Sequence, residues 1–199
     1  KALINMIDTA NTASKKRGKL IVVSGPSGVG KGTVCGILKK NKDKLNLSVS
    51  VSATTRAPRD DEKEGINYFF KTEDEFRDMV DNGCFLEWAT YNDHNYGTPE
   101  KPVLEKLEKG INVLLEIDVQ GALKVMEKYP GGVYVFISPP SIEELRNRLV
   151  GRGSESAEEI EKRVKLAEWE MLQRDKYDYI VVNDVLEEAV KKVAQIITA

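Results

Sequence analysis

The sequence predicts an α/β fold: a three-layer α/β/α core around a parallel sheet, with an inserted β-rich subdomain and a helical lid. Short apolar runs alternate along the chain with longer segments of helical spacing. The first run, residues 20–23, is apolar throughout, which is typical of a strand buried on both faces. A glycine-rich loop and a helical segment follow it directly. Such sheets bind ligands at the carboxyl ends of their strands.

Composition narrows the class of protein. A chain of 199 residues suits one domain with insertions, and 41% hydrophobic with 31% charged residues is typical of a globular protein. A net charge of −2 gives no general attraction to nucleic acid or to membranes, and no apolar run approaches the roughly 20 residues that span a bilayer. Two cysteines without disulfide or metal spacing indicate a reducing, cytoplasmic location.

The first residues differ from the rest of the chain. Residues 8–18 are polar and lack the apolar core of a signal peptide. We expect residues 1–17 to form a flexible arm, with Met6 as a possible native start.

Seven strands are predicted from the apolar runs. Residues 48–52 alternate apolar and polar side chains, which is typical of a half-buried strand. The cluster 92–95 is rich in Asn and Asp and predicts a turn. Residues 52–98 are therefore expected to form the β-rich insert. The predicted strands are residues 20–23, 48–52, 67–70, 85–89, 113–118, 133–137 and 179–182.

Helix boundaries are marked by capping residues. Capping boxes begin at Thr72, Ser141 and Ser156, and the spacing of apolar residues from Val185 to Ile197 predicts a C-terminal amphipathic helix. The predicted helices are residues 34–44, 72–82, 98–110, 119–128, 141–151, a segment of about 18 residues from Ser156, and 185–197.

The loop after the first strand has the pattern of a phosphate-binding P-loop. Its glycines let successive N–H groups point at an anion, while Lys31 and the helix N-terminus add positive charge. The general motif has Ser or Thr directly after the lysine, but here Gly32 precedes Thr33. An ordinary glycine-rich turn is the alternative, which the flanking strand and helix disfavour. The residues expected to bind a polyphosphate are Gly25, Pro26, Ser27, Gly28, Val29, Gly30, Lys31, Gly32 and Thr33.

Acidic residues end the strand of residues 113–118. Asp118 suits the acid that helps to hold a magnesium–nucleotide complex, and Glu116 and the loop at Asn183 are expected in the same crevice. Because Mg²⁺ keeps several waters and binds through phosphates, Thr33 or a water can replace the missing hydroxyl at Gly32. The alternative for Asp118 is a helix cap.

Two groups of arginines form a second signal. Arg56 and Arg59 flank a proline, and their planar guanidinium groups suit phosphate oxygens. The alternative is ion pairing with the acidic residues 60–64. The group Arg148, Arg152 and Arg163 flanks glycines 151 and 153, which predicts a mobile lid for phosphoryl transfer. Pairing with neighbouring glutamates is the alternative there.

The segment Thr55-Arg56-x-x-Arg59-x-x-Glu62-x-x-Gly65-x-x-Tyr68-x-Phe70 resembles the signature of the guanylate kinase family. Further segments resemble the same family in the same order: the P-loop, 85–88, 96–98, 116–121, 139–141, 151–153 and 182–184. The resemblance covers residues 18–197. It implies an ATP-binding core (18–51, 99–140 and 175–199), a GMP-binding insert (52–98) and a lid (about 141–174).

The resemblance also assigns roles to single residues. It implies that Arg56, Arg59, Tyr68 and Tyr96 grip the GMP phosphate, and that Ser52, Glu87 and Thr98 read the guanine beside Glu116 and Asp118. It places Asn183 near the adenine and makes Lys31, Arg148, Arg152 and Arg163 the catalytic residues. The choice of Glu87 agrees with guanine chemistry, because guanine presents N1–H and N2–H donors where adenine has an unprotonated N1.

The expected reaction is ATP + GMP → ADP + GDP with Mg²⁺, with dGMP as a further acceptor, in purine nucleotide metabolism and GMP recycling. The expected protein is a monomer or homodimer that acts on these small molecules, and not on nucleic acid or membranes. Two alternatives stay open: a non-catalytic guanylate-kinase-like binding module, and a small P-loop kinase for another acceptor. An intact P-loop with lid arginines disfavours the first, and Arg56, Arg59, Tyr68 and Glu87 disfavour the second.

Overall fold

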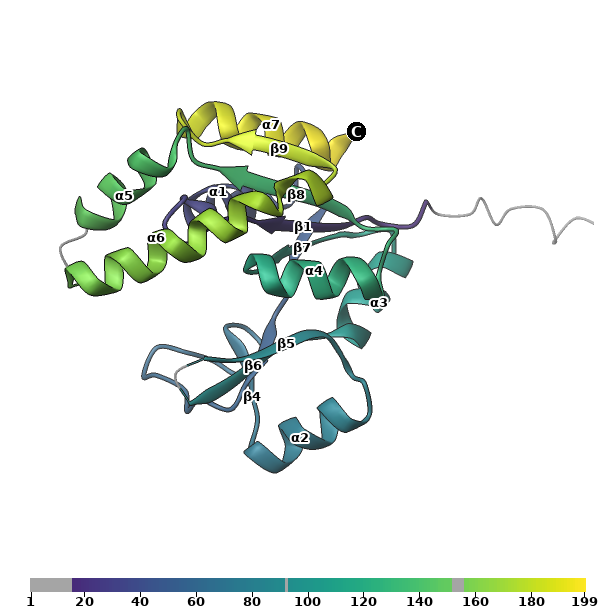
Figure 1. Cartoon of the computed structure of the whole chain (residues 1–199). Helices are drawn as coiled ribbons and strands as arrows, with labels where there is room; N and C mark the ends of the chain where they lie inside the picture. Colours follow the sequence, from purple (N-terminus) through teal and green to yellow (C-terminus); the bar gives the residue numbers. More distant parts are fainter. Residues whose placement is uncertain (1–15, 92, 152–155) are drawn as a thin grey trace, which may run out of the picture.

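A computed structural model describes residues 16–91, 93–151 and 156–199, and it confirms the predicted α/β class. The core is a five-stranded, all-parallel sheet in the order β2-β7-β1-β8-β9 (Figure 1). A second, four-stranded sheet has the order β4-β3-β6-β5. The strands are β1 (Leu20–Ser24), β2 (Leu47–Val49), β3 (Ser52–Thr54), β4 (Tyr68–Phe70), β5 (Phe85–Tyr91), β6 (His94–Pro99), β7 (Asn112–Glu116), β8 (Val133–Ser138) and β9 (Tyr179–Val182).

Seven α-helices and one 3-10 helix lie among the described residues. Side chains at helix N-caps explain several of their starts: Thr72 and Ser156 form complete capping boxes, and the Ser141 hydroxyl accepts the Glu144 amide at 3.0 Å. The helices are α1 (Lys31–Lys40), α2 (Glu73–Asp81), α3 (Glu100–Glu108), α4 (Val119–Lys128), α5 (Ile142–Gly151), α6 (Ala157–Leu172), η1 (Arg174–Lys176) and α7 (Leu186–Thr198).

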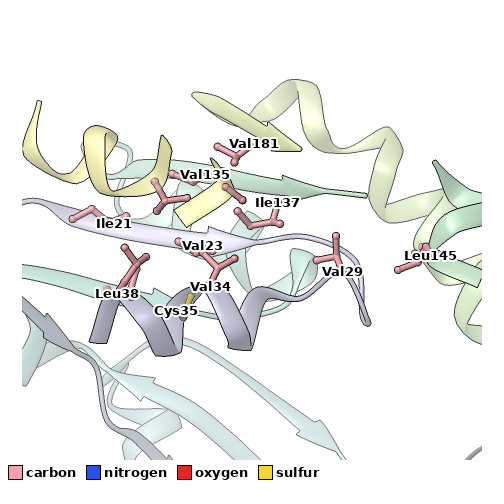
Figure 2. Close-up of a cluster of buried hydrophobic side chains, with 14 of the residues drawn as sticks. Ile21, Val23, Val29, Val34, Cys35, Leu38, Val135, Ile137, Leu145 and Val181 are labelled. Carbon is pink, nitrogen blue, oxygen red and sulfur yellow. The ribbon is translucent and has the colours of Figure 1, made fainter. Parts of the chain in front are cut away.

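The central strand β1 is buried on both faces, as its apolar sequence predicts. Ile21 and Val23 face a cluster that includes α1 and α7, part of which is drawn in Figure 2. Leu20 and Val22 face the opposite way, into a cluster with α3 and α4. Since successive side chains of a strand point to opposite faces, these two clusters define the three-layer core.

The second sheet and α2 lie beside the core sheet as a smaller lobe (Figure 1). Phe76 of α2 is buried against Phe85 of β5, with ring centroids 4.6 Å apart. A small cluster around these rings and Ala53 forms the apolar interior of this lobe. The lobe therefore has its own apolar cluster and its own sheet.

Two local predictions were wrong. Residues 48–52 form no single strand: β2 ends at Val49 in the core sheet, and β3 begins at Ser52 in the second sheet. Residues 94–99, expected to be a turn and a helix start, form β6, which pairs with β5 and β3. Long-range pairing overrides the local turn and helix signals in both segments. The first helix also begins earlier than predicted, at Lys31 within the glycine-rich loop.

Candidate active site

The glycine-rich loop joins β1 to α1 and is closed by a side chain from the far end of the chain. Asn183, which follows β9, is buried and donates from Nδ2 to the Val29 carbonyl at 2.8 Å. Gly30 is the N-cap of α1 with φ 97°, and a Cβ there would lie 2.5 Å from Asn183 Nδ2. Glycine is thus required both by the backbone conformation and by the close approach of Asn183.

Lys31 lies within its own loop. Its ammonium group donates to the carbonyls of Gly25 at 2.6 Å and Pro26 at 3.0 Å. Burial lowers the pKa of Lys31, while the negative charges of Glu170, Glu116 and Asp118 act in the opposite direction. The loop therefore presents a cation, one helix N-terminus and several backbone amides at the carboxyl end of β1.

Glu116, the last residue of β7, links this loop to a second site. A Cβ at Gly32 would lie 3.4 Å from Glu116 Oε1, an ordinary van der Waals contact, so the residue after Lys31 lies beside this carboxylate. Burial raises the pKa of Glu116, although Lys31 and a hydrogen bond from the Cys35 thiol lower it. Thr33 lies exposed in the first turn of α1.

A cavity of about 280 Å³ opens between the two sheets. Strands of the second sheet supply most of its walls, and the end of β7 closes the side toward the core. The lining residues are Ser52, Tyr68, Glu87, Ala89, Tyr96, Gly97, Glu116, Ile117 and Asp118. Of the residues predicted for an acceptor site, six line this cavity together.

Glu87 is the most deeply placed acid of the cavity wall. Thr98, fully buried on the neighbouring strand β6, donates its hydroxyl to Glu87 Oε1 at 2.7 Å. Burial raises the pKa of Glu87, the Thr98 hydrogen bond lowers it, and the charge of Asp118 raises it further. A Cβ at Gly121 would lie 3.3 Å from Glu87 Oε2 and 3.1 Å from Asp118 Oδ1, so this glycine lets both carboxylates approach α4.

Asp118 is the N-cap of α4, so the alternative that it caps a helix is confirmed. Its Oδ1 accepts the Gly121 amide at 2.6 Å at the N-terminus of α4. It nevertheless lines the cavity, so the two roles are compatible in space. Among residues 16–91, 93–151 and 156–199, no group of three or more His, Cys, Asp and Glu side chains is arranged to hold a metal ion.

Arg56 lies beside Tyr68, an aromatic residue that lines the cavity. Its guanidinium group donates to both carboxylate oxygens of Glu62, at 2.8 and 2.9 Å, and lies 5.4 Å from the centre of the Tyr68 ring. The Tyr96 ring lies 6.1 Å from that of Tyr68. Arg59 is exposed, and its backbone amide donates to Glu62 at 2.9 Å. The ion-pair alternative is thus confirmed for Arg56, although Arg56 also lies beside two cavity residues.

The predicted lid arginines are divided between two helices. Arg148 of α5 donates to the Asn183 carbonyl and to Glu144, each at 3.1 Å. Arg163 lies on α6 and is partly buried. An ion pair between Arg146 and Glu161 connects the two helices. Arg152 is outside the described residues.

Comparisons with known proteins agree with this geometry. The family model described as guanylate kinase matches residues 17–199. The chain belongs to the guanylate kinase family.

Relatives within this family are similar over almost the whole chain. The guanylate kinase of Caldanaerobacter subterraneus subsp. tengcongensis is 57% identical, with 93% of this chain and 89% of that protein covered. That of Halalkalibacterium halodurans is 52% identical, with 93% and 90% covered. The crystal structure of guanylate kinase from Anaplasma phagocytophilum is 37% identical, with a TM-score of 0.70 over 92% of this chain and 86% of that one.

Two acids of this guanylate-kinase family member carry interactions that the sequence reasoning did not assign. Glu62 was noted in the signature and lies among the acidic residues 60–64 considered as partners, but which of these acids pairs with Arg56 was not predicted. Glu170 was missed, although it occupies a core position of α6: Ile160, Val164, Ala167 and Glu170 are the buried residues of that helix. A glutamate in the apolar stripe of an amphipathic helix is the signal that could have identified it.

Proposed function

We propose that this protein transfers the terminal phosphoryl group of ATP to GMP, giving ADP and GDP. The observation that carries the proposal is the position of Glu116. Its carboxylate lies beside Lys31 and Gly32 on one side and lines the cavity with Glu87 on the other. A phosphate loop and an acid-lined cavity that share a wall suit direct transfer between two bound nucleotides.

The phosphate loop suits the donor. Residues 25–33 offer backbone amides to the phosphates of ATP, and Lys31 exchanges its two backbone carbonyls for phosphate oxygens when ATP binds. Asn183 holds the loop from behind and is proposed to lie near the adenine. Mg²⁺ would neutralise charge on the transferring group, held mainly by phosphates and water, with Thr33 and Asp118 as the nearest protein ligands.

The cavity suits the acceptor. The Glu87 carboxylate, oriented by Thr98, matches the N1–H and N2–H donors of guanine, and Ser52, Glu116 and Asp118 complete that wall. Tyr68 and Tyr96, with Arg56 beside them, suit the phosphate of GMP. Arg59 reaches this phosphate only by leaving its exposed position. dGMP is proposed as a second acceptor.

Each part of the chain is given a separate role in binding or transfer. We propose residues 18–51, 99–140 and 175–199 as the ATP-binding core, 52–98 as the GMP-binding insert, and about 141–174 as the lid. Arg148, Arg152 and Arg163 then act on the transferring phosphoryl group from the lid. Residues 1–17 are proposed as a flexible arm.

The compartment and the oligomeric state are also proposals. Cys35 and Cys84 are free thiols, which supports a reducing compartment such as the cytoplasm. Within the described residues no helix is both long and apolar enough to cross a bilayer. We propose a monomer or homodimer that works on free nucleotides in purine metabolism and GMP recycling.

A coupled assay of ADP release tests the proposal. The full chain is incubated with ATP, Mg²⁺ and one of GMP, dGMP, IMP, AMP, CMP or UMP. Turnover with GMP, and none with AMP, CMP or UMP, is the expected result. Binding of GMP without turnover would favour the non-catalytic binding module, and turnover with AMP, CMP or UMP in place of GMP would favour a different acceptor.

A further inference from the structure

The buried acid behind the phosphate loop is Glu170 of α6. Only 4% of its surface is exposed. Its carboxylate accepts a hydrogen bond from the backbone amide of Ser27, in the middle of the loop. Its Oε2 atom is buried without a hydrogen-bond partner among the described residues. An acid in such a place costs stability when it is charged, so its presence needs an explanation.

The charged and titratable groups around Glu170 come from several elements. Lys31 of α1 supplies the positive charge, and Asp118, ahead of α4, supplies a second negative charge. Tyr177, after η1, is 8% exposed, and burial raises its pKa to about 12, so its phenol is neutral. The charges of Lys31 and Asp118 therefore act on Glu170 through space in opposite directions, and the neutral phenol of Tyr177 adds no charge.

We propose that Glu170 is a positioning residue of the phosphate loop: as a carboxylate it holds the Ser27 amide opposite Lys31 in the free protein, and it takes up one proton from solvent when the nucleotide's phosphates bind there. This inference rests on the proposed function, because it requires a polyphosphate in this loop. It adds a coupling between proton binding and nucleotide binding at that site.

The physical reason is competition between two anions for the same partners. The nucleotide brings several negative charges to Lys31 and to the loop amides. Glu170 then loses the attraction that offsets its burial, and like charges nearby disfavour its ionised form. Burial already raises the pKa of Glu170 to about 7, so little further shift is needed for protonation at neutral pH. Protonation removes the repulsion between the carboxylate and the phosphates.

Isothermal titration calorimetry with MgADP measures this directly in the unmodified protein. At pH 7.5, the binding enthalpy is recorded in buffers of different ionisation enthalpy, and the slope gives the number of protons taken up. We expect uptake of roughly 0.5 to 0.8 proton per MgADP, falling toward zero near pH 5.5, where Glu170 is already protonated.

Three variants test whether the proton binds to Glu170. Glu170→Gln keeps the shape but cannot ionise, so it should lose the uptake and bind MgADP about 3- to 10-fold more tightly than the wild type at pH 8.5. Glu168→Gln is the matched control: it removes an exposed acid from the same helix, and it should keep the uptake. Glu170→Asp keeps the charge and should keep a pH-dependent affinity.

Different outcomes would contradict the role of Glu170 and the proposed binding of ATP. MgADP binding without proton uptake in the wild type, or with equal uptake in Glu170→Gln, overturns the role of Glu170. A Gln variant that binds more weakly at every pH, with unchanged pH dependence, would reduce Glu170 to a packing residue. Absence of MgADP binding by the wild type would instead contradict the proposed ATP site.

Discussion

The Thr98 hydroxyl donates to Glu87 Oε1 at 2.7 Å, across two neighbouring strands of the smaller sheet. Thr98 has no exposed surface, so solvent does not compete with Glu87 for its hydroxyl group. The hydrogen bond fixes the orientation of a carboxylate whose pKa is raised by burial. A buried and oriented acceptor is what a site for the donor edge of guanine needs.

Glu87→Gln should therefore erode selectivity for GMP. The amide offers one acceptor and a mismatched donor, so kcat/KM for GMP should fall by about 10²- to 10⁴-fold, with little change for AMP. Initial rates with both acceptors check this, and Thr98→Ser, which keeps the hydroxyl, serves as control. Undiminished discrimination would remove Glu87 from the guanine site.

Lys31→Ala should abolish most turnover while leaving the fold intact. The ammonium group contacts two carbonyls of its own loop, and its removal should lower kcat by about 10²-fold or more, as for the loss of one stabilising charge in a transition state. Single-turnover kinetics and urea unfolding measure the two effects separately. Lys39→Ala, an exposed lysine at the end of the same helix, should change neither. A well-folded and fully active Lys31→Ala protein would refute the donor role of the loop.

Arg56→Lys should raise KM for GMP by about 10-fold and change KM for ATP little, because a lysine cannot reproduce the planar fork. Arg56 Nη2 donates both hydrogen bonds to Glu62, and Nη1 donates to the Ala57 carbonyl at 2.7 Å, so the guanidinium group binds two partners at once beside Tyr68. Arg77→Lys is the control, since Arg77 is exposed on α2 and pairs with Asp74 at 3.6 Å. Equal effects of the two changes would place Arg56 outside the acceptor site.

Gly30→Ala should damage the phosphate loop. The new methyl group meets Asn183 Nδ2 at 2.5 Å, and φ of 97° is strained for alanine, so the free energy of unfolding should fall by about 1–3 kcal/mol. Affinity for MgADP should fall with it. Gly36→Ala in the same helix meets nothing within 4 Å and should stabilise the protein by about 0.5–1 kcal/mol. Similar stability changes of the same sign would contradict the steric argument.

Stability should depend on pH through Glu170. The pKa of about 7 in the folded protein lies above the ordinary value of 4.5, so the folded state keeps a proton that the unfolded chain releases between those values. The resulting stability is fully present below pH 4.5 and is lost as the pH rises through 7.

Comparison with Glu170→Gln isolates this contribution from other carboxylates. The wild type minus variant difference in unfolding free energy should decrease by roughly 3 kcal/mol from pH 4.5 to 7.5. Urea unfolding at four or five pH values measures the difference. A constant difference across this range would show that Glu170 titrates normally in the folded protein.

Local patterns in the sequence suffice to predict the class of fold, most of its elements and the glycine-rich loop between β1 and α1. The helix α4 begins and ends where predicted, and the capping boxes at Thr72 and Ser156 are present. These features depend on periodicity and on contacts within one turn, so local pattern suffices for them. The family signature is local in the same sense, and so it names candidate residues without placing them.

Which side chains share a site depends on how distant parts of the chain pack together. The division of residues 48–52 between two sheets, the pairing of β6, and the position of Glu170 behind Ser27 all depend on contacts between distant parts of the chain. Strand pairing and helix docking set such contacts, and neither leaves a local signal. The acid on α6 and the lysine after β1 face each other for that reason, 139 positions apart in the sequence.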